Sequence, residues 1–171
     1  MSNEEFVIRN MVQEDCENIA HAFALQNWNK PAEQYERYFQ EQMNNERLIL
    51  IAEYCGEFAG YLTIVWKPYY PHFLHNGIPE IVDLNVLIKY RKAGIATHLI
   101  KNAEEIVALN YDEIGIGVGL IPDYGAAQRL YVKLGYIPDG LGLSKNEQYV
   151  KYGDSVIADD DLIICFTKKL K

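Results

Sequence analysis

Apolar and polar residues along the chain follow two periods, which predict a succession of strands and helices. Residues 6–9 alternate like a strand, and apolar residues then recur at helical spacing as far as about Leu25. Pro31 suits the first turn of a second helix. Residues 81–88 form a nearly continuous apolar run, as expected for a strand buried on both faces. The predicted order is a strand at 6–9, helices at about 12–25 and 31–43, strands at 47–54, 58–66 and 81–88, a helix at 95–109, a strand at 114–121, a helix at 125–134, and strands at 136–143 and 155–167.

Turn and loop residues separate these elements and limit the choice of fold. Three prolines and a glycine predict a loop at 67–79, and Cys55-Gly56 predicts the turn of a hairpin. Gly135 stands where the end of a helix needs a left-handed residue. Strands interrupted by crossover helices favour a mixed α/β (α+β) sheet, and strand-helix-strand over 81–121 predicts one parallel pair. We expect a single domain over residues 1–171.

Composition narrows the function classes. Hydrophobic residues make up 49% and charged residues 23%, with a formal net charge of -8, which disfavours nucleic acid and weakly favours cationic ligands such as amines. The longest apolar run is too short to span a bilayer, and the acidic start Met1–Glu5 lacks a signal-peptide layout, so we expect a cytoplasmic protein without a membrane partner. The cysteines Cys16, Cys55 and Cys165 are scattered and predict reduced thiols without a metal site.

The segment after the buried strand carries the candidate chemistry. There a basic loop leads into a predicted helix through Arg91-Lys92-Ala93-Gly94-Ile95-Ala96-Thr97. The first turn of a helix has unpaired amides and the positive end of the helix dipole, which together bind anions. The spacing matches neither GxxxxGK[ST] nor GxGxxG. A phosphate cradle and an ordinary strand-to-helix turn both remain open on this segment alone.

This loop resembles the [Q/R]-x-x-G-x-[G/A] cofactor motif of the GNAT superfamily of N-acetyltransferases, with Ala96 at its last position. A second segment, Tyr124-Gly-Ala-Ala-Gln-Arg-Leu-Tyr-Val-Lys-Leu-Gly-Tyr136, resembles the family's N-x-x-A-x-x-L-Y-x-x-x-G-[F/Y] helix. Both the order of the motifs and the order of the elements over residues 6–171 are those of the family. The resemblance implies a mostly antiparallel, seven-stranded sheet with a central parallel pair and about four helices.

The resemblance also implies acetyl-CoA as co-substrate, with neither metal nor flavin. Where the family often has asparagine, this chain has Tyr124, whose hydroxyl or ring face would replace that contact, with Asp123 as another acceptor. The residues implied for the cofactor are Leu84, Asn85 and Val86 for the pantetheine arm, Arg91, Lys92, Ala93, Gly94, Ile95, Ala96 and Thr97 for the pyrophosphate, and Tyr124 and Ala127 at the arm's other side.

The resemblance further implies direct acetyl transfer, with Tyr131 protonating the departing thiolate. A phenol of ordinary pKa about 10 can supply that proton, although most tyrosines on amphipathic helices only pack. Glu80 is the implied base, and Asp83 is an alternative. Three residues apart, they should project to opposite faces of a regular strand unless a bulge intervenes. His72 and His75 in the aromatic loop are further alternatives.

In the family, the acceptor site is built from the first two helices and their connection and from the loop between the last two strands. In this chain these regions hold residues 26–29 and 149–161, and with the loop at 69–75 they predict an aromatic, acidic pocket. The acceptor would be a primary amine of a small molecule or a peptide. A non-catalytic acetyl-CoA sensor or interaction domain is the alternative. Homodimers are common in the family, but the sequence does not fix the oligomer.

Overall fold

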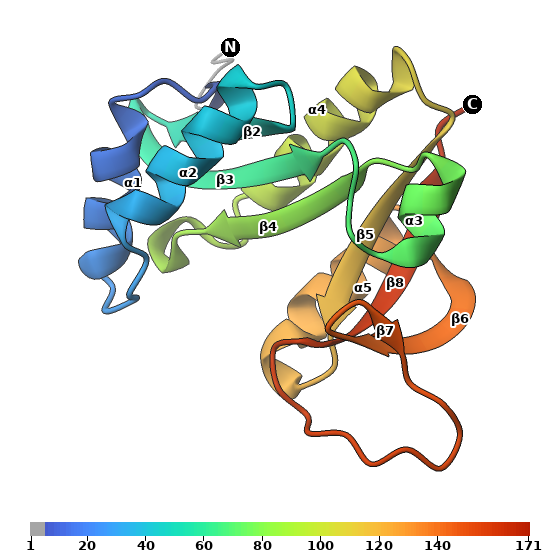
Figure 1. Cartoon of the computed structure of the whole chain (residues 1–171). Coiled ribbons are helices and arrows are strands. Elements are labelled where there is room, and N and C mark those ends of the chain that lie inside the picture. Colours follow the sequence, from blue (N-terminus) through green and yellow to red (C-terminus); the bar gives the residue numbers. More distant parts are fainter. Residues whose placement is uncertain (1–5) are drawn as a thin grey trace. The chain divides into compact units, whose positions relative to one another are not determined.

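The computed structural model describes residues 6–171, and the acidic segment Met1–Glu5 lies outside the described residues. The chain divides into two compact units. The first comprises the described residues up to Val65 together with Val82–Ala103, and the second comprises Trp66–Ile81 together with Glu104–Lys171. Strand β4 and helix α4 each contribute residues to both units (Figure 1).

Eight strands and five α-helices follow one another along the described residues. The strands form one sheet in the order β1-β2-β3-β4-β5-β8-β6-β7. The elements are β1 (Phe6–Asn10), α1 (Asp15–Ala24), α2 (Ala32–Met43), β2 (Arg47–Tyr54), β3 (Glu57–Val65), α3 (Pro71–Asn76), β4 (Glu80–Val86), α4 (Ile95–Ala108), β5 (Glu113–Gly119), α5 (Gly125–Lys133), β6 (Ile137–Lys145), β7 (Gln148–Tyr149) and β8 (Leu162–Lys169), with 3₁₀ turns at Ile88–Tyr90 and Pro122–Tyr124.

The sheet is mostly antiparallel, as the resemblance implied. Strand β2 pairs with β1 and β3, and β8 pairs with β5 and β6, all antiparallel. The predicted parallel pair is formed by β4 and β5, where Glu80 is opposite Gly115 and Ile81 is opposite Ile116. The strand-helix-strand prediction over 81–121 is therefore confirmed.

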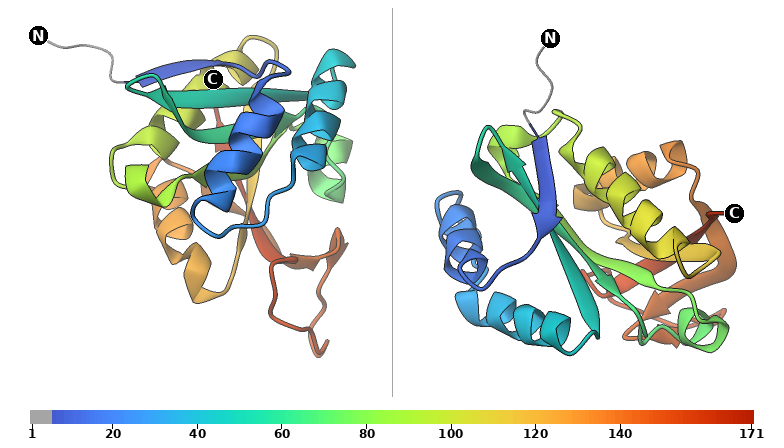
Figure 2. Two further views of the ribbon diagram at one scale, coloured as in Figure 1. Left: turned by 90° about the vertical axis from the view of Figure 1, so that its left-hand side faces the viewer. Right: turned by 90° about the horizontal axis from the view of Figure 1, so that it is seen from above.

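In the first unit, α1 and α2 pack side by side on one face of the strands (Figure 2). Their apolar faces and the strands bury a cluster in which the rings of Phe23, Tyr35 and Tyr61 meet edge to face. All three side chains are fully buried. Aromatic pairs in this geometry stabilise a core beyond the area that they bury. This core supports the residues of β4 that are described below.

The second unit has a smaller aromatic core under α3, where Tyr70 and Phe73 pack with Ile78 and Cys165. The ring of Phe73 occupies the space that a side chain at residue 115 would need, since a Cβ on Gly115 would lie 2.4 Å from it. After β7, residues 150–161 form a long loop that extends away from the unit's strands (Figure 1).

The structure adds two elements to the predicted order and corrects the bounds of two strands. Residues 67–79 were expected to be a loop, but Pro71 begins the short helix α3 and left-handed Gly77 ends it, a placement that suits both residues. The last strand begins at Leu162 instead of residue 155. The apolar run 81–88 stops being a strand after Val86, because Ile88–Tyr90 turns as a 3₁₀ helix. The two-residue strand β7 makes eight strands where seven were expected.

Candidate functional site

The loop before α4 contains two left-handed residues and leads directly into the helix. Lys92 and Gly94 are both left-handed, with φ of 66° and 84°, and α4 begins at the next residue, Ile95. The amide of His98 donates to the Gly94 carbonyl at 3.1 Å and closes the first turn of the helix. The amides that precede it in this turn have no carbonyl one turn earlier to which they could donate. The segment from Arg91 to Gly94 is exposed, so an anion can reach these amides.

The basic side chains and the connection from α1 to α2 support this loop. The guanidinium of Arg91 lies over the ring of Trp28, 5.4 Å from its centroid. The amide of Ile88 donates to the Gln26 side-chain oxygen at 3.0 Å. Two residues of the connection thus contact the segment that leads into the loop. The fit to a pyrophosphate rests on the loop's left-handed residues, its helix N-terminus and its cationic side chains.

The stretch Leu84–Val86 in β4 runs very close to β3. A Cβ on Gly60 would lie 2.6 Å from the carbonyl oxygen of Asn85, so only glycine fits opposite it. The amide of Leu87 then donates to the Ala59 carbonyl at 2.9 Å. The Asn85 side chain donates to Asp83 Oδ1 at 2.6 Å.

In the second unit, α5 carries Tyr131, whose side chain is buried at 6% exposure. Its ring lies 6.2 Å from that of Tyr136. Burial alone raises the pKa of Tyr131 to about 12. The phenol therefore keeps its proton at neutral pH, which a proton donor requires.

Tyr124 directly precedes α5 and makes contacts inside the second unit. Its hydroxyl donates to Asp160 Oδ1 at 2.8 Å, and burial followed by this hydrogen bond raises the pKa of Tyr124 to about 12. Its ring stands over Gly119, where a Cβ would lie 2.4 Å from the ring. The neighbouring Asp123 is exposed, and Ala127 is half-buried one turn along the helix.

Glu80 begins β4 and is half-buried. A Cβ on Gly117 of β5 would lie 3.6 Å from Glu80 Oε1 and 3.8 Å from Cys165 Sγ. Burial, followed by the charge of Glu80, raises the pKa of the Cys165 thiol. The thiol is therefore neutral, and Glu80 faces the glycine-rich middle of β5.

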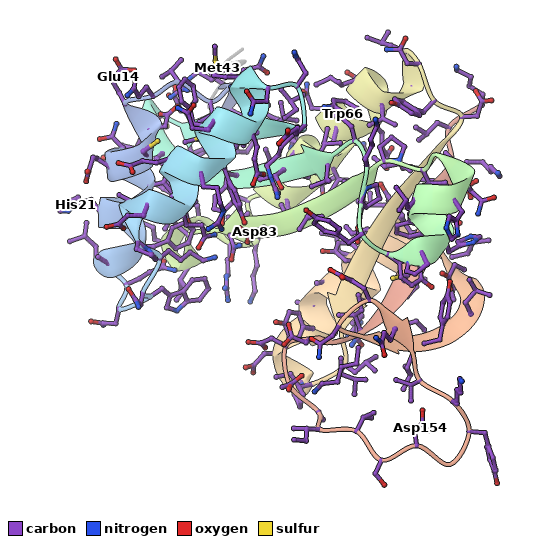
Figure 3. All side chains as sticks on the ribbon, in the orientation of Figure 1. Glu14, His21, Met43, Trp66, Asp83 and Asp154 are labelled. Carbon is purple, nitrogen blue, oxygen red and sulfur yellow. The ribbon has the colours of Figure 1, made fainter. Side chains whose placement is uncertain are left out.

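Asp83 breaks the regularity of β4. Its φ is 59°, a left-handed conformation inside a strand, so β4 is not the regular strand for which Glu80 and Asp83 were expected to project to opposite faces. Residues held in this way cost of order 1–3 kcal/mol and cluster at functional sites. The side chain of Asp83 lies next to α2 and is 17% exposed (Figure 3).

Five donors surround the Asp83 carboxylate, all from the first unit. Oδ2 accepts from the hydroxyls of Tyr61 at 2.6 Å and Tyr38 at 3.1 Å. Gln34 Nε2 donates to the same oxygen at 3.2 Å. Oδ1 accepts from Asn85 at 2.6 Å and from the Lys30 ammonium at 3.5 Å. Sequence reasoning missed this cluster, because Tyr38 only fitted the apolar face of a helix and Tyr61 fitted a strand.

The tyrosines of this cluster are neutral donors. Burial, followed by the charge of Asp83, raises the pKa of Tyr38 to about 12 and raises the pKa of Tyr61 well above its usual range. Tyr35 donates to the Tyr61 hydroxyl at 3.3 Å and extends the network into the core. The carboxylate is thus held by hydroxyls that keep their protons at physiological pH.

The other predicted acceptor elements are held by local contacts. Asp159 pairs with Lys145 at 2.6 Å, and Asp160 accepts from Tyr124, so this acidic turn is already bonded. Figure 3 labels Asp154 in the same loop, where its carboxylate accepts from a backbone amide. His72 contacts the Asn76 side chain at 3.2 Å on exposed α3.

A groove of about 660 Å³ lies between α1 and α2, and none of the predicted site residues lines it. Its lining includes Glu14, Glu17, Glu33 and Glu36, with the buried Cys16 below. Within residues 6–171, no cluster of three His, Cys, Asp or Glu side chains could hold a metal ion, and no helix is long and apolar enough to cross a membrane.

The predicted site residues divide between the two units. Leu84–Val86 and Arg91–Thr97 lie in the first unit, on one continuous stretch of chain with Asp83 just before it. Glu80, Tyr124, Ala127 and Tyr131 lie in the second unit. Within the first unit, the left-handed Asp83 and the loop before α4 therefore lie on the same strand and its following turn.

Comparison with known proteins identifies the architecture. The family model described as the acetyltransferase (GNAT) family matches residues 12–136. An N-acetyltransferase from Staphylococcus aureus Mu50 has a TM-score of 0.71 and 21% identity, covering 99% of this chain and 100% of that chain. The yncA protein of Salmonella typhimurium, solved with its cofactor acetyl-CoA, has a TM-score of 0.67 and 18% identity, covering 98% and 95%.

A dodecameric spermidine N-acetyltransferase from Vibrio cholerae has a TM-score of 0.67 and 16% identity, covering 98% of this chain and 95% of that chain. No curated protein matches the chain. Because these identities are low, the similarity to the solved structures shows that the fold is shared and nothing further.

Proposed function

Because the chain belongs to the acetyltransferase (GNAT) family, we propose that it is an acetyl-CoA-dependent N-acetyltransferase that moves the acetyl group directly to a primary amine of a small molecule or a peptide. The observation that supports this proposal is the loop before α4, where two left-handed residues lead into the start of the helix, an arrangement that suits a bound anion. We take residues 1–171 to act as one domain. The three free cysteines favour a reducing compartment such as the cytoplasm.

The first unit would bind the cofactor. The amides of Lys92, Ala93, Gly94, Ile95, Ala96 and Thr97 would hold the pyrophosphate, aided by the positive charge of Arg91. Backbone groups of Leu84, Asn85 and Val86 would pair with the pantetheine arm. When bound, acetyl-CoA supplies an acetyl thioester and a thiolate leaving group.

The second unit would supply proton transfer. Tyr131 holds its proton at neutral pH, so its hydroxyl would donate it to the departing thiolate sulfur. The Glu80 carboxylate would take a proton from the acceptor ammonium, directly or through water. Ala127 and Tyr124 would border the arm on α5. For Tyr124 we propose that the ring makes this contact and not the hydroxyl, since the hydroxyl already donates to Asp160.

The test is release of the coenzyme A thiol over a panel of diamines, aminoglycosides and peptide N-termini, followed by mass spectrometry of the acceptor. We expect thiol release together with a mono-acetylated amine. Binding of acetyl-CoA without release over the whole panel would instead identify a non-catalytic sensor. Absence of any acetyl-CoA binding would overturn both assignments.

A further inference from the structure

The side chain of Lys30 occupies a ready-made site for an alkylammonium ion in the first unit. Its Nζ lies 3.5 Å from Asp83 Oδ1 and 3.3 Å from the Tyr61 hydroxyl. The same atom lies 5.5 Å from the centroid of Phe23 and 5.9 Å from that of Tyr61. A carboxylate and two aromatic rings around one ammonium are the usual elements by which proteins recognise alkylammonium ligands.

Lys30 itself is loosely held in this site. Its polar contacts of 3.3 and 3.5 Å are longer than the 2.7–2.9 Å usual for a charge-assisted hydrogen bond. Asp83, in contrast, is fixed at 2.6 Å by both Tyr61 and Asn85. The carboxylate therefore keeps its place without the lysine, and the site persists when the lysine leaves.

The position of Lys30 in the chain makes its departure easy. It belongs to the connection between α1 and α2, two residues before the helix begins at Ala32, so neither helix fixes its backbone. A lysine ammonium sits on a flexible four-carbon stem with three rotatable donors. Rotation of this stem is enough to carry Nζ out of the site.

We propose that Asp83, with the rings of Phe23 and Tyr61, binds an ammonium group of the acceptor, and that Lys30 fills this site in the free protein and is displaced by the acceptor. This inference rests on the proposed function for the identity of the acceptor as an amine. Asp83 directly precedes Leu84–Val86, and at about 3.3 Å per residue the site lies roughly 3–10 Å along the strand from the residues assigned to the arm.

The chemistry of the site indicates which nitrogen it holds. A carboxylate and aromatic faces favour the charged form of an amine. The nitrogen that attacks a thioester must first lose its proton, so this site opposes reaction of the nitrogen that it binds. The site therefore suits a second, non-reacting ammonium, and the acceptor class is an aliphatic diamine or a longer polyamine.

The experiment is isothermal titration calorimetry of 1,4-diaminobutane into the full chain, which detects binding whether or not transfer occurs. Lys30→Met removes the internal ammonium and keeps the length of the side chain, so it should tighten binding about tenfold, the combined scale of a cation–π contact and a partly exposed ion pair. Asp83→Asn should weaken binding tenfold or more. Asparagine tolerates the left-handed backbone as aspartate does, and an unchanged melting curve would verify folding.

Lys89→Met is the matched control in the same unit. The Lys89 ammonium also contacts a carboxylate, Glu57 at 2.9 Å, and an aromatic ring, Tyr90 at 4.6 Å, but on the exposed surface. This variant should bind 1,4-diaminobutane as the unaltered protein does. An equal gain of affinity in both lysine variants would show only a general effect of charge and would overturn the inference.

Two further results would overturn it. Weaker binding in Lys30→Met would mean that the lysine helps to hold the ligand, and unchanged binding in Asp83→Asn would remove the carboxylate from the site. The proposed function fails separately. If the diamine binds through Asp83 but no acetyl transfer occurs with acetyl-CoA present, the ammonium site stands and the enzyme assignment falls. If an amine is acetylated at the same rate in the unaltered protein, Lys30→Met and Asp83→Asn, the enzyme assignment stands and the ammonium site is overturned.

Discussion

Gly94 is the residue at which the proposed cofactor site can be tested most directly. Its φ of 84° is left-handed, and a Cβ there would lie 3.6 Å from the His98 ring, an ordinary contact. The Cβ of a glutamate at this position therefore fits, and the expected cost is backbone strain of about 1–2 kcal/mol. For a chain of this size that cost lowers Tm by several degrees.

The same substitution places a carboxylate in the proposed pyrophosphate cradle. Two negative charges roughly 5 Å apart at an effective dielectric constant of about 20 repel each other by about 3 kcal/mol. This repulsion corresponds to a loss of acetyl-CoA affinity of about a hundredfold. At a ligand concentration of about 100 times the original Kd, acetyl-CoA stabilises the unaltered protein by about 2.7 kcal/mol and Gly94→Glu by only about 0.4 kcal/mol.

Gly56 provides the matched control. Its φ of 80° is nearly the same, no atom lies within 4 Å of its added Cβ, and it lies in the hairpin turn of the same unit. Gly56→Glu should lose a similar amount of stability and keep the full shift with acetyl-CoA. Thermal melts of the three proteins with and without ligand are the assay. The reasoning is refuted if Gly94→Glu keeps the shift, or if both variants lose it equally.

Three further predictions concern single residues. Tyr131→Phe should lower turnover about 10²- to 10⁴-fold in the thiol-release assay while acetyl-CoA affinity is kept; equal turnover would exclude the acid role. Asp15→Ala should cost about 3 kcal/mol in urea unfolding, because the 4%-exposed carboxylate accepts from Arg9 and the Val12 amide, and Asp15→Asn should cost less. Burial raises the pKa of Tyr131 from 10 to about 12. The neutral phenol therefore contributes roughly 3 kcal/mol to the free energy of unfolding below pH 10, and this contribution is lost as the pH rises towards 12. The measurement is a pH titration that follows unfolding by circular dichroism and tyrosine ionisation by tyrosinate absorbance. Unfolding at a lower pH than tyrosine ionisation would contradict the prediction.

The elements that follow from sequence are those whose local signals agree with their packing. Strand β2 matches its prediction at both ends, and α5 ends before Gly135, which has the expected left-handed φ of 92°. Helix α3 was not predicted, because the three prolines in residues 67–79 indicate a loop and the helix, Pro71–Asn76, has only six residues. Residues 155–161 were predicted as part of the last strand, but β8 pairs only from Leu162 onward, and pairing is a tertiary property.

The candidate site also has one part that could be predicted from the sequence and one part that could not. The loop from Arg91 to Thr97 could be predicted because its chemistry depends on backbone amides at a helix start, and a short motif records that arrangement. The Asp83 cluster could not be predicted. Its members come from α2, β3, β4 and a connection, and their spacing in the sequence carries no common pattern. The one local hint was that the charged Asp83 lies inside the largely apolar run 81–88.

Stability alone does not account for the arrangement at Asp83. A left-handed aspartate in the middle of a strand costs of order 1–3 kcal/mol, and an apolar residue in a regular β4 would avoid both this strain and the desolvation of a charge. Tyr38, Tyr61 and Asn85 offset the desolvation by donating to the carboxylate, which also fixes its direction. A carboxylate that is held so firmly, yet meets the Lys30 ammonium at 3.5 Å, is preorganised for an ammonium that approaches more closely than Lys30 does. That mismatch is the physical reason for placing the acceptor's charged nitrogen at Asp83.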